Sequence, residues 1–488
     1  MSRTQLALVL LIAAGCNRGK PVAADLVIEN VTLIDGTDRP ARPGMSVAVA
    51  AGEIVAVEEA GKLTVVPTAA RVDGQGKFLI PGLWDMHVHL FGYREHSFPL
   101  FLANGVTTIR DVGGELASSL WLRQETTFGR ILGPEMLIAG PTLDADYVMR
   151  AVKGTVYEPA RAAIPDSAAA VRMVDSLGRV GVDQIKVHGM TPRAAYFAVL
   201  REAKKRGILV VGHIPDSVTA TEAIEAGQRT IEHNSRVPEA ESGREAEITR
   251  VTLAAMQRAI NAAGSHPRIG PIFQLRMAAF DSAIQSFDPV TASAFADLAA
   301  KRDVWFDPTL VVMEALFRIN EPEVHTRPET VYVPRAGKDF DEGFSPKPNP
   351  TAADIAEGRR EWKNMLVTFK PLIKAGVKFV AGTDVPVLPL VPGFALQREL
   401  GLLVEAGLSP LQAIQAATRN AADASGKLHT VGTVEKGKRA DLVLLDADPL
   451  ADIHNTGRIR AVISRGRLLD RATLDRMLRD AEAFARQP

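Results

Sequence analysis

Short apolar runs alternate with longer amphipathic segments through the middle of the chain. A run of about four to eight apolar residues is typical of a buried strand, and apolar residues three or four apart are typical of a helix. Strands that alternate with helices predict βα units and a parallel sheet. Eight such runs end near His89, Val112, Ala139, His188, His213, His233, Phe306 and Asp384. They predict an α/β protein in which residues 81–426 form a (β/α)8 TIM-like barrel.

The helices between these runs end where the sequence supplies a stop signal. Glycine readily takes the left-handed conformation that closes many helices. Helices are predicted at 167–179, 191–206 and 219–226, and each ends close to a glycine: Gly181, Gly207 or Gly227.

Two connections are too long for simple turns. Residues 239–302 are predicted to be largely helical. Residues 319–351 are rich in proline and charge, and are predicted to form an ordered loop or lid. Both follow strand ends, so they would emerge at the carboxyl-terminal face, where the active sites of barrels lie.

Both flanks of this region carry a different pattern. Apolar and polar residues alternate in 26–35, 45–58 and 70–80, and strand-like runs return at 441–445 and 461–464. Such segments, interrupted by glycine turns, predict antiparallel strands. We predict one small β-sandwich domain built from residues 21–80 and 427–475, followed by a C-terminal helix or tail at 476–488.

Residues 1–20 are predicted to be a signal peptide or lipoprotein N-terminus. Arg3 precedes the apolar stretch 6–14, and small residues follow it. The segment AAGC that ends at Cys16 resembles a bacterial lipobox with alanine in place of leucine, and a plain cleaved signal is the alternative. We expect export to the periplasm or a lipid anchor in a bacterial membrane. Cys16 is the only cysteine, so no intramolecular disulfide can form.

Composition narrows the class of partner. The 488 residues are 46% hydrophobic and 23% charged, as in ordinary globular proteins. Lys plus Arg and Asp plus Glu both number 57, so no basic excess favours nucleic acid as a partner. We expect a small molecule or short peptide as substrate, and membrane contact only through the lipid anchor. The sequence does not set the oligomeric state.

Side chains that bind metals lie at the ends of several apolar runs. His87 and His89 are two positions apart, so in a strand their imidazoles point to one face. Later runs end with four further candidates: Lys186, His213, His233 and Asp384. Imidazoles and carboxylates are typical ligands of zinc and similar ions. A lysine inside a barrel is costly as a cation unless it is neutralised or modified.

Four segments carry a resemblance to a known family. They are PGLWDMHVH at 81–89, GVTTIRD at 105–111, ATRNAA at 417–422 and GTVEKGKRADLV at 432–443. With these segments the chain resembles the amidohydrolase superfamily, specifically its imidazolonepropionase-like and prolidase-like members. The resemblance implies a barrel with a terminal β-sandwich. In its two-metal members it also implies two divalent ions bridged by a carboxylated lysine.

The resemblance also implies a role for each candidate ligand. One ion would be held by His87, His89 and Asp384, the other by His213 and His233, and carboxylated Lys186 would bridge them. Zinc is the expected metal, with manganese, cobalt or iron as alternatives. An unmodified lysine would leave a single-metal site. A hydroxide between two ions would attack the substrate, while Asp384 takes its proton and passes it to the departing nitrogen.

Six residues are candidates for substrate contact because they follow strands or face the metal ligands: Tyr93, Arg94, His96, Arg110, Tyr147 and His188. For Arg110 the alternative is an ion pair with Asp111 or another acid. For His188 it is a packed, hydrogen-bonded role. Glu232 alternates with His233 along a strand and is expected to face the surrounding helices.

The leading hypothesis is hydrolysis of a C–N amide bond in a dipeptide or N-acyl amino acid. The same hydroxide would also attack an ester, a lactone or a phosphotriester, and the resemblance admits a cyclic amide of the imidazolone type. A lipid-anchored scaffold without catalysis is the alternative from another class. The complete set of ligands counts against it.

Overall fold

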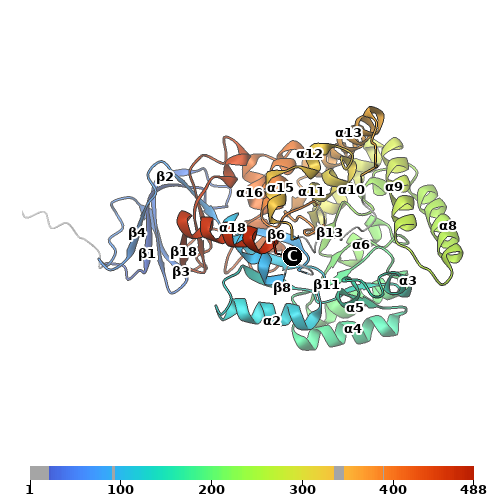
Figure 1. The fold of residues 1–488 in the computed structure, drawn as a ribbon, viewed down its shortest axis with the longest axis horizontal. Helices are drawn as coiled ribbons and strands as arrows, with labels where there is room; N and C mark the ends of the chain where they lie inside the picture. Colours follow the sequence, from blue (N-terminus) through green and yellow to red (C-terminus); the bar gives the residue numbers. More distant parts are fainter. Residues whose placement is uncertain (1–20, 91–93, 335–345, 388, 488) are drawn as a thin grey trace, which may run out of the picture.

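The computed structural model describes residues 21–90, 94–334, 346–387 and 389–487. The predicted signal segment at 1–20, with Cys16, and the candidate Tyr93 lie outside these residues. Within the described ranges, no helix has both the length and the apolar character needed to cross a membrane. A terminal sheet occupies one end of the long axis, and parallel strands with helices form the rest (Figure 1).

The central region has a parallel strand in each of the eight predicted places. One sheet has the order β6-β7-β8, with β6 at Leu83–Val88, β7 at Val106–Asp111 and β8 at Glu135–Ile138. The other has the order β10-β9-β11-β12-β13-β14-β15: Arg161–Ala163, Thr142–Asp144, Gln184–Val187, Leu209–Gly212, Thr230–Glu232, Trp305–Asp307 and Lys378–Phe379. All pairings are parallel. The prediction of an α/β fold with parallel sheets is confirmed.

Backbone hydrogen bonds connect the two parallel sheets. Asp183 N donates to Ile138 O at 2.9 Å, between the start of β11 and the end of β8. On the other side, Met86 N in β6 donates to Ala381 O at 2.9 Å, just beyond β15. The strands are short, so these connections fall partly outside them.

Three helices confirm the stop signals read from the sequence. They are α4 at Ser167–Val180, α5 at Arg193–Arg206 and α6 at Ala220–Ala226. Their C-caps Gly181, Gly207 and Gly227 have φ of 76°, 68° and 92°, which a glycine adopts without steric cost. The other helices beside the strands are α1 (Phe98–Ala103), α2 (Leu116–Thr127), α3 (Asp146–Ala151), α11 (Leu310–Phe317), α14 (Phe369–Lys374), α15 (Phe394–Glu405), α16 (Pro410–Ala416) and α17 (Arg419–Ala424).

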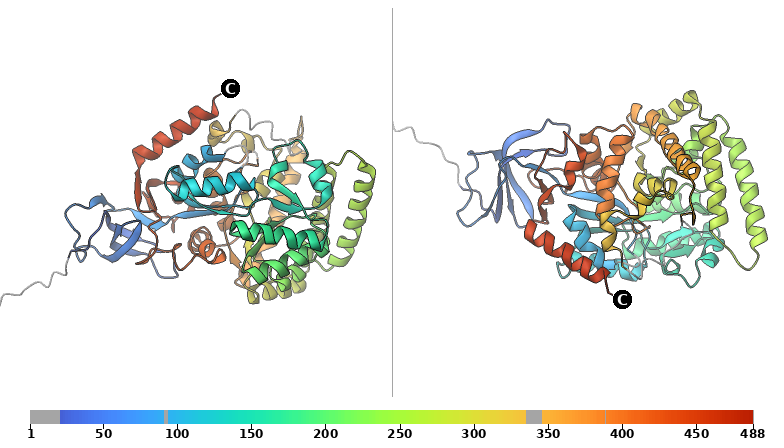
Figure 2. Two further views of the ribbon diagram at one scale, coloured as in Figure 1. Left: turned by 90° about the horizontal axis from the view of Figure 1, so that it is seen from below. Right: turned by 45° about the horizontal axis from the view of Figure 1, so that its top comes forward.

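The connection between β13 and β14 is helical, as predicted. It contains α7 (Val237–Ala240), α8 (Glu245–Ala263), α9 (Gly270–Gln285) and α10 (Pro289–Lys301). Helices α8 and α9 lie at the end of the molecule opposite the terminal sheet (Figure 1 and Figure 2). The connection after α11 holds α12 (Pro322–His325), the 3-10 helix η3 (Pro328–Tyr332) and α13 (Ala352–Val367).

Strands from both flanks form one eight-stranded sheet. The first flank gives β1 (Leu26–Leu33), β2 (Arg42–Ala50), β3 (Glu53–Glu59), β4 (Ala70–Asp73) and β5 (Phe78–Pro81), and the second gives β16 (Leu442–Leu445), β17 (Ile459–Ser464) and β18 (Arg467–Asp470). Strand β5 pairs antiparallel with β16 and so joins the two parts. Strand β1 pairs antiparallel with β2, as predicted, but the antiparallel prediction is wrong for its pairings with β4 and β5, which are parallel.

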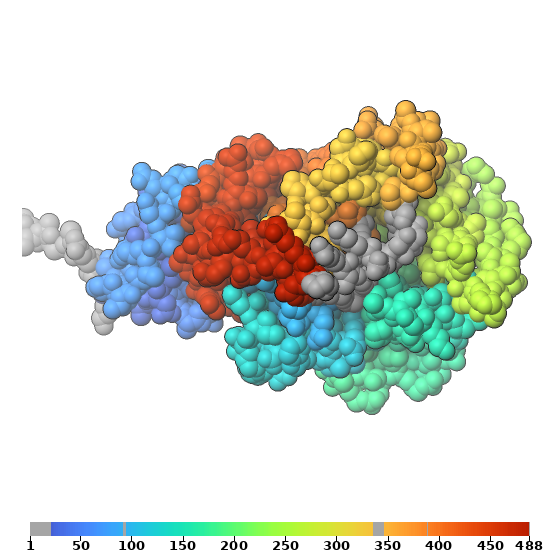
Figure 3. All heavy atoms as spheres, in the orientation of Figure 1, coloured from blue at the N-terminus to red at the C-terminus, as the bar shows by residue number. Residues whose placement is uncertain are grey.

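The C-terminal helix α18, Arg471–Ala485, begins within the range 427–475 that the sequence assigns to the sheet. Asp470 caps it by accepting a hydrogen bond from Thr473 N at 2.8 Å. The helix lies across the junction of the terminal sheet and the central region (Figure 3). Near its end, the Phe484 ring stacks on His96 in η1 (Arg94–Ser97), with centroids 3.8 Å apart.

Candidate metal centre

The six residues predicted to bind metal come from five strand ends. His87 lies in β6 and Lys186 in β11, whereas His89, His213, His233 and Asp384 lie in the segments that follow β6, β12, β13 and β15. Carboxyl ends of neighbouring parallel strands meet at one edge of a sheet, so their side chains converge. The structure places all six within one cluster.

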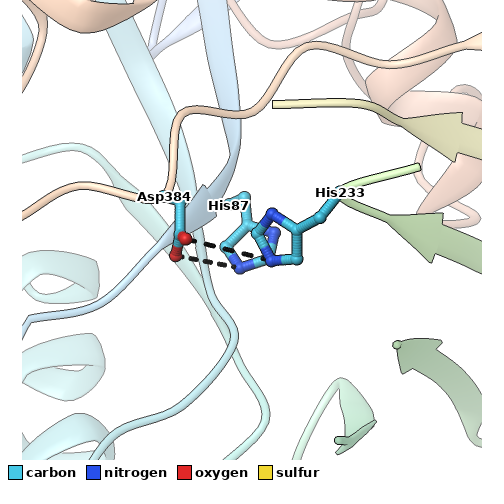
Figure 4. A group of neighbouring side chains, drawn as sticks. All are labelled: His87, His233 and Asp384. Atoms are coloured by element: carbon cyan, nitrogen blue, oxygen red, sulfur yellow. Dashed lines mark ion pairs between the residues drawn. The ribbon is translucent and has the colours of Figure 1, made fainter. Parts of the chain in front are cut away.

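Asp384 lies at the centre of this cluster. Its Oδ1 is 3.4 Å from Nε2 of His87 and 3.3 Å from Nε2 of His89, and its Oδ2 is 3.9 Å from Nε2 of His233. Figure 4 shows the carboxylate facing the imidazoles of His87 and His233. Asp384 and His233 have φ of 64° and 56°, a left-handed conformation that is uncommon outside glycine. Such strain is found where a side chain must be aimed at a functional group.

Lys186 points into the same cluster. Its Nζ lies 3.2 Å from Nε2 of His87, and the residue is only 2% exposed. Burial lowers the pKa of Lys186 to about 8, so a fraction of the side chain is a neutral amine near neutral pH.

His213 completes the cluster on the side of β12. Its ring centroid is 4.6 Å from that of His233 and 4.4 Å from that of His188. Nδ1 of His213 is buried and has no hydrogen-bond partner among the described residues. An imidazole nitrogen without a partner in a buried polar cluster is suited to bind a cation.

Hydrogen bonds on the outer side of the cluster orient three of the imidazoles. Nδ1 of His87 is 2.7 Å from Oε2 of Glu232, and Nδ1 of His89 is 2.9 Å from Gly113 O. Nδ1 of His233 is 2.7 Å from Oγ1 of Thr309, whose hydroxyl donates to Pro308 O. Each acceptor places a proton on Nδ1 and leaves the Nε2 lone pair facing the cluster, the tautomer in which Nε2 can bind a metal ion.

The imidazoles are held in the neutral form. Burial lowers the pKa of His233 to about 4, and it lowers the pKa of His87 and His213 well below the ordinary value. Burial alone would raise the pKa of Asp384, but the nearby imidazoles outweigh burial and hold it below its usual range. The cluster therefore presents neutral nitrogens around an ionised carboxylate, a donor set that fits a divalent ion.

Two groups of three residues have ligand atoms within 4.8 Å of one another among the described residues. The first is His87, His233 and Asp384, and the second is His87, Glu232 and Asp307. In the second group both carboxylates are occupied by Arg110, whose Nη2 is 3.0 Å from Oε1 of Glu232 and 2.9 Å from Oδ2 of Asp307. The first group, together with Lys186 and the remaining histidines, is the better cation site.

The expectation that Glu232 faces the helices is wrong. Glu232 is fully buried and contacts His87, on the inner side of the strands. Alternation holds only within an extended strand, and β13 ends at Glu232. The positive φ of His233 then turns its ring back to the same side. The sequence holds a signal for the position of Glu232. Thr230 is a second polar residue two positions earlier, so both side chains lie on the same face of β13, where the Thr230 hydroxyl donates to the Glu232 carboxylate.

Arg110 is placed beneath the cluster. It is 2% exposed, and its partners are Glu232, Asp307 and Thr230 rather than Asp111. The Asp111 carboxylate instead accepts from the Ser119 hydroxyl at 2.7 Å. The geometry matches the alternative reading of Arg110, an ion pair with another acid.

The other candidates for substrate contact lie in different surroundings. His188 is next to the cluster, with Nδ1 2.7 Å from Oδ2 of Asp144. The Tyr147 hydroxyl donates to Arg268 O at 3.0 Å, so it contacts the insertion before α9. Arg94 lies over the Trp121 ring, 5.8 Å from its centroid, while His96 stacks on Phe484.

Comparison with known proteins places the chain in a family. The model of the amidohydrolase family matches residues 78–260 and 349–469, more than half of the chain. The chain belongs to the amidohydrolase family. This confirms the resemblance read from the sequence, and the expected enzyme class, a hydrolase acting on C–N bonds, agrees with it. Amidohydrolases generally bind metal ions, as the donor set described above would allow.

Individual relatives share shorter stretches with this amidohydrolase. An N-acyl-D-aspartate deacylase from Alcaligenes xylosoxydans xylosoxydans is 30% identical over 214 residues, 42% of this chain and 40% of that protein. An imidazolonepropionase from Geobacillus kaustophilus is 34% identical over 108 residues, 20% of this chain and 24% of that protein. The chain thus spans less than half the length of these curated relatives.

Solved structures share the fold over most of the chain. The bottromycin amidohydrolase has a TM-score of 0.69 at 22% identity, and the match covers 94% of this chain and 90% of that one. A Xaa-Pro dipeptidase with bound methionine has a TM-score of 0.63 at 20% identity, with 91% and 99% covered. At these identities the likeness shows a common fold.

Proposed function

We propose that this amidohydrolase is a metal-dependent enzyme that cleaves a C–N amide bond, in a dipeptide or an N-acyl amino acid. The observation that carries the proposal is the position of Asp384, with its two carboxylate oxygens within 3.9 Å of three imidazoles. The family match supports hydrolysis, and the deacylase and dipeptidase among the similar proteins support an amide substrate.

Two divalent ions fit the donor set. One would be held by His87, His89 and Asp384, and the other by His213 and His233. Lys186, carboxylated on Nζ, would lie between them; its burial favours the neutral amine that such a modification requires. Zinc is the metal we expect from these ligands. When bound, such ions would lower the pKa of water and polarise the carbonyl group of the substrate.

Asp384 is the proposed proton carrier. Its ionised carboxylate would take a proton from the attacking water and deliver it to the departing nitrogen. Glu232 and Thr309 would keep the Nε2 atoms of His87 and His233 facing the ions throughout. Arg110 would neutralise the buried negative charge of Glu232 through their ion pair.

The proposal also covers the architecture of the chain and its location. The hydrogen bonds between the two parallel sheets support one closed eight-unit barrel, with the terminal sheet as a sandwich domain beside it. We also propose export, with Cys16 as the lipid-anchored residue. Replacement Cys16→Ser should release the protein from membranes, and unchanged anchoring would rule out lipidation.

The direct test combines metal analysis with a substrate panel. We expect about two ions per chain, and turnover of dipeptides or N-acyl amino acids above that of lactones and aryl esters. Asp384→Asn should lower kcat by about 10²–10⁴-fold and leave at least one metal bound. Asp297→Asn, an exposed position on α10, is the matched control. Turnover of esters alone would favour the alternative hydrolase, and no turnover with metals in place would favour a binding scaffold.

A further inference from the structure

Arg276 reaches from the helical insertion back to the strand ends that carry the cluster. It lies on α9, and its guanidinium forms a bidentate pair with Asp216, with Nε 2.9 Å from Oδ1 and Nη2 2.8 Å from Oδ2. Asp216 N in turn donates to Gly189 O at 2.8 Å. Gly189 directly follows His188, and Asp216 closely follows His213. The guanidinium is therefore fixed to the loops beyond β11 and β12, beside two histidines of the site.

The backbone at Gly189 leaves room for this guanidinium. A Cβ atom at position 189 would lie 2.6 Å from Nη2 and 3.0 Å from Cζ of Arg276. Real carbon atoms do not approach so closely, so any larger residue at 189 would push the guanidinium away. Glycine at this position is what allows Arg276 to lie against the loop after His188.

The charge of Arg276 acts on the cluster. After burial and nearer groups, it is one of the charges that lower the pKa of both His213 and His188. Its partner Asp216 follows His213 by three residues, and Gly189, against which it packs, directly follows His188, so the guanidinium lies on the loops that carry these two imidazoles. Arg276 has no role in the proton transfers that we assign to Asp384.

One edge of the guanidinium is left for a ligand. Asp216 takes the Nε–Nη2 edge, and Nη1 has no hydrogen-bond partner among the described residues. The side chain of Arg276 is 24% exposed, so it is not sealed inside the protein. A guanidinium held on one edge is pre-organised to bind a carboxylate on the other, with two parallel N–H···O bonds.

We propose that Arg276 binds a free carboxylate of the substrate, with Asp216 as its positioning residue. The inference rests on the proposed amide hydrolysis and narrows its substrates to N-acyl amino acids and dipeptides with an unblocked C-terminus. It also replaces the role considered for Arg110, which is buried in its pairs with Glu232 and Asp307. The insertion between β13 and β14 thus supplies the specificity of the site.

The test uses pairs of N-acetylated amino acids that share the scissile amide and differ in one group, a free carboxylate or a carboxamide. Binding is measured by calorimetry in the metal-loaded Asp384→Asn protein, in which we expect turnover to be slowed by about 10²–10⁴-fold. We expect the acids to bind about ten-fold or more tightly than the carboxamides. Adding Arg276→Gln should remove this difference, and Gly189→Ala should reduce it by displacing the guanidinium. Arg244→Gln, an exposed pair partner of Glu247 in the same insertion, is the control.

Turnover by the otherwise unmodified protein separates the possible failures. Arg276→Gln should lower kcat/KM for the acids about ten-fold or more and leave the carboxamides within about three-fold. An equal loss for both probes, or no acid preference that depends on Arg276 in binding, would show a structural tether and overturn the inference. Cleavage of amides without acid preference would leave the proposed function standing. Arg276-dependent binding of acids without any cleavage would instead reject the proposed function and keep the carboxylate site.

Discussion

The carboxylate of Glu232 lies 2.7 Å from Nδ1 of His87, on the opposite side of the ring from Asp384 and Lys186. One imidazole therefore joins the cluster to a buried ion-pair network beneath it. Arg110 extends this network to Asp307. A carboxylate behind a histidine fixes its tautomer and raises its basicity as a ligand.

Glu232→Gln should weaken metal binding, because an amide keeps the shape of the acceptor and loses its charge. We expect a loss of about 10–100-fold in metal affinity, measured by competition with a chromophoric chelator. The variant also leaves Arg110 with one acid fewer, and breaking a buried pair costs about 3–5 kcal/mol. Glu247→Gln, an exposed acid on α8, is the control. Unchanged affinity in a folded Glu232→Gln protein would remove Glu232 from the metal site.

Lys186→Met should reduce the metal content below that of the unmodified protein. Methionine is an unbranched side chain one heavy atom shorter than lysine, and it cannot be carboxylated. Elemental analysis should show the loss, whereas Lys374→Met at the end of α14 should retain the full content. In the unmodified protein, metal reloading should be faster with added bicarbonate, because carboxylation of Nζ consumes carbon dioxide. A rate independent of bicarbonate would argue for an unmodified lysine.

Removal of metal should lower the melting temperature. A ligand that binds only the folded state stabilises that state by mass action, and divalent ions held by this cluster would act in this way. Dialysis against a chelator should lower Tm by several degrees, by about 1 °C for each kcal/mol lost in a protein of this size. Added zinc should restore Tm in a concentration-dependent way. Equal melting curves with and without metal would contradict a built cation site.

Glu241 should make stability depend on pH. The residue is fully buried, and neither carboxylate oxygen has a hydrogen-bond partner among the described residues. Burial raises the pKa of Glu241 to about 9. Between pH about 4.5 and 9 the folded chain keeps a proton that the unfolded chain has released. The free energy of unfolding should therefore fall as the pH rises through this window.

The measurement is urea unfolding at pH 5 and pH 9. Glu241→Gln should remove the Glu241 contribution and be more stable than the unmodified protein at pH 9 by about 1–3 kcal/mol. At pH 5 the two proteins should differ little. Glu247→Gln should keep the pH dependence of the unmodified protein. A Glu241→Gln protein with the same dependence would show that the carboxyl group finds a partner.

The alternation of apolar runs located eight of the ten strands in the two parallel sheets and missed the short β9 and β10, and the same rule located the cluster. The carboxyl ends of neighbouring parallel strands converge regardless of the conformation of the loops. His87, Lys186 and His213 could therefore be placed together from their positions in the sequence. The rule failed one residue beyond β13, where a positive φ at His233 replaces extended backbone. Glu232 was therefore assigned to the wrong side.

Contacts between elements that lie far apart in the sequence could not be predicted from the sequence. Arg276 belongs to a helix whose periodicity says nothing about the loops after β11 and β12, which it contacts. Arg110 pairs with Glu232 and Asp307 across the inside of the strands, and no spacing along the chain indicates this. Tertiary packing decides such pairs.

The pairing of β5 with β16 has a consequence for how the protein is made. These strands lie on either side of the entire central region, and Ile80 faces Val443 in their ladder. Contacts between residues so far apart in sequence are slow to form, because the entropy of closing a long loop must be overcome first. During synthesis, the amino-terminal strands would wait with an unpaired edge until the ribosome had delivered nearly all of the polypeptide. An unpaired strand edge can pair with other chains, so this topology creates a need for a chaperone that protects the edge during synthesis.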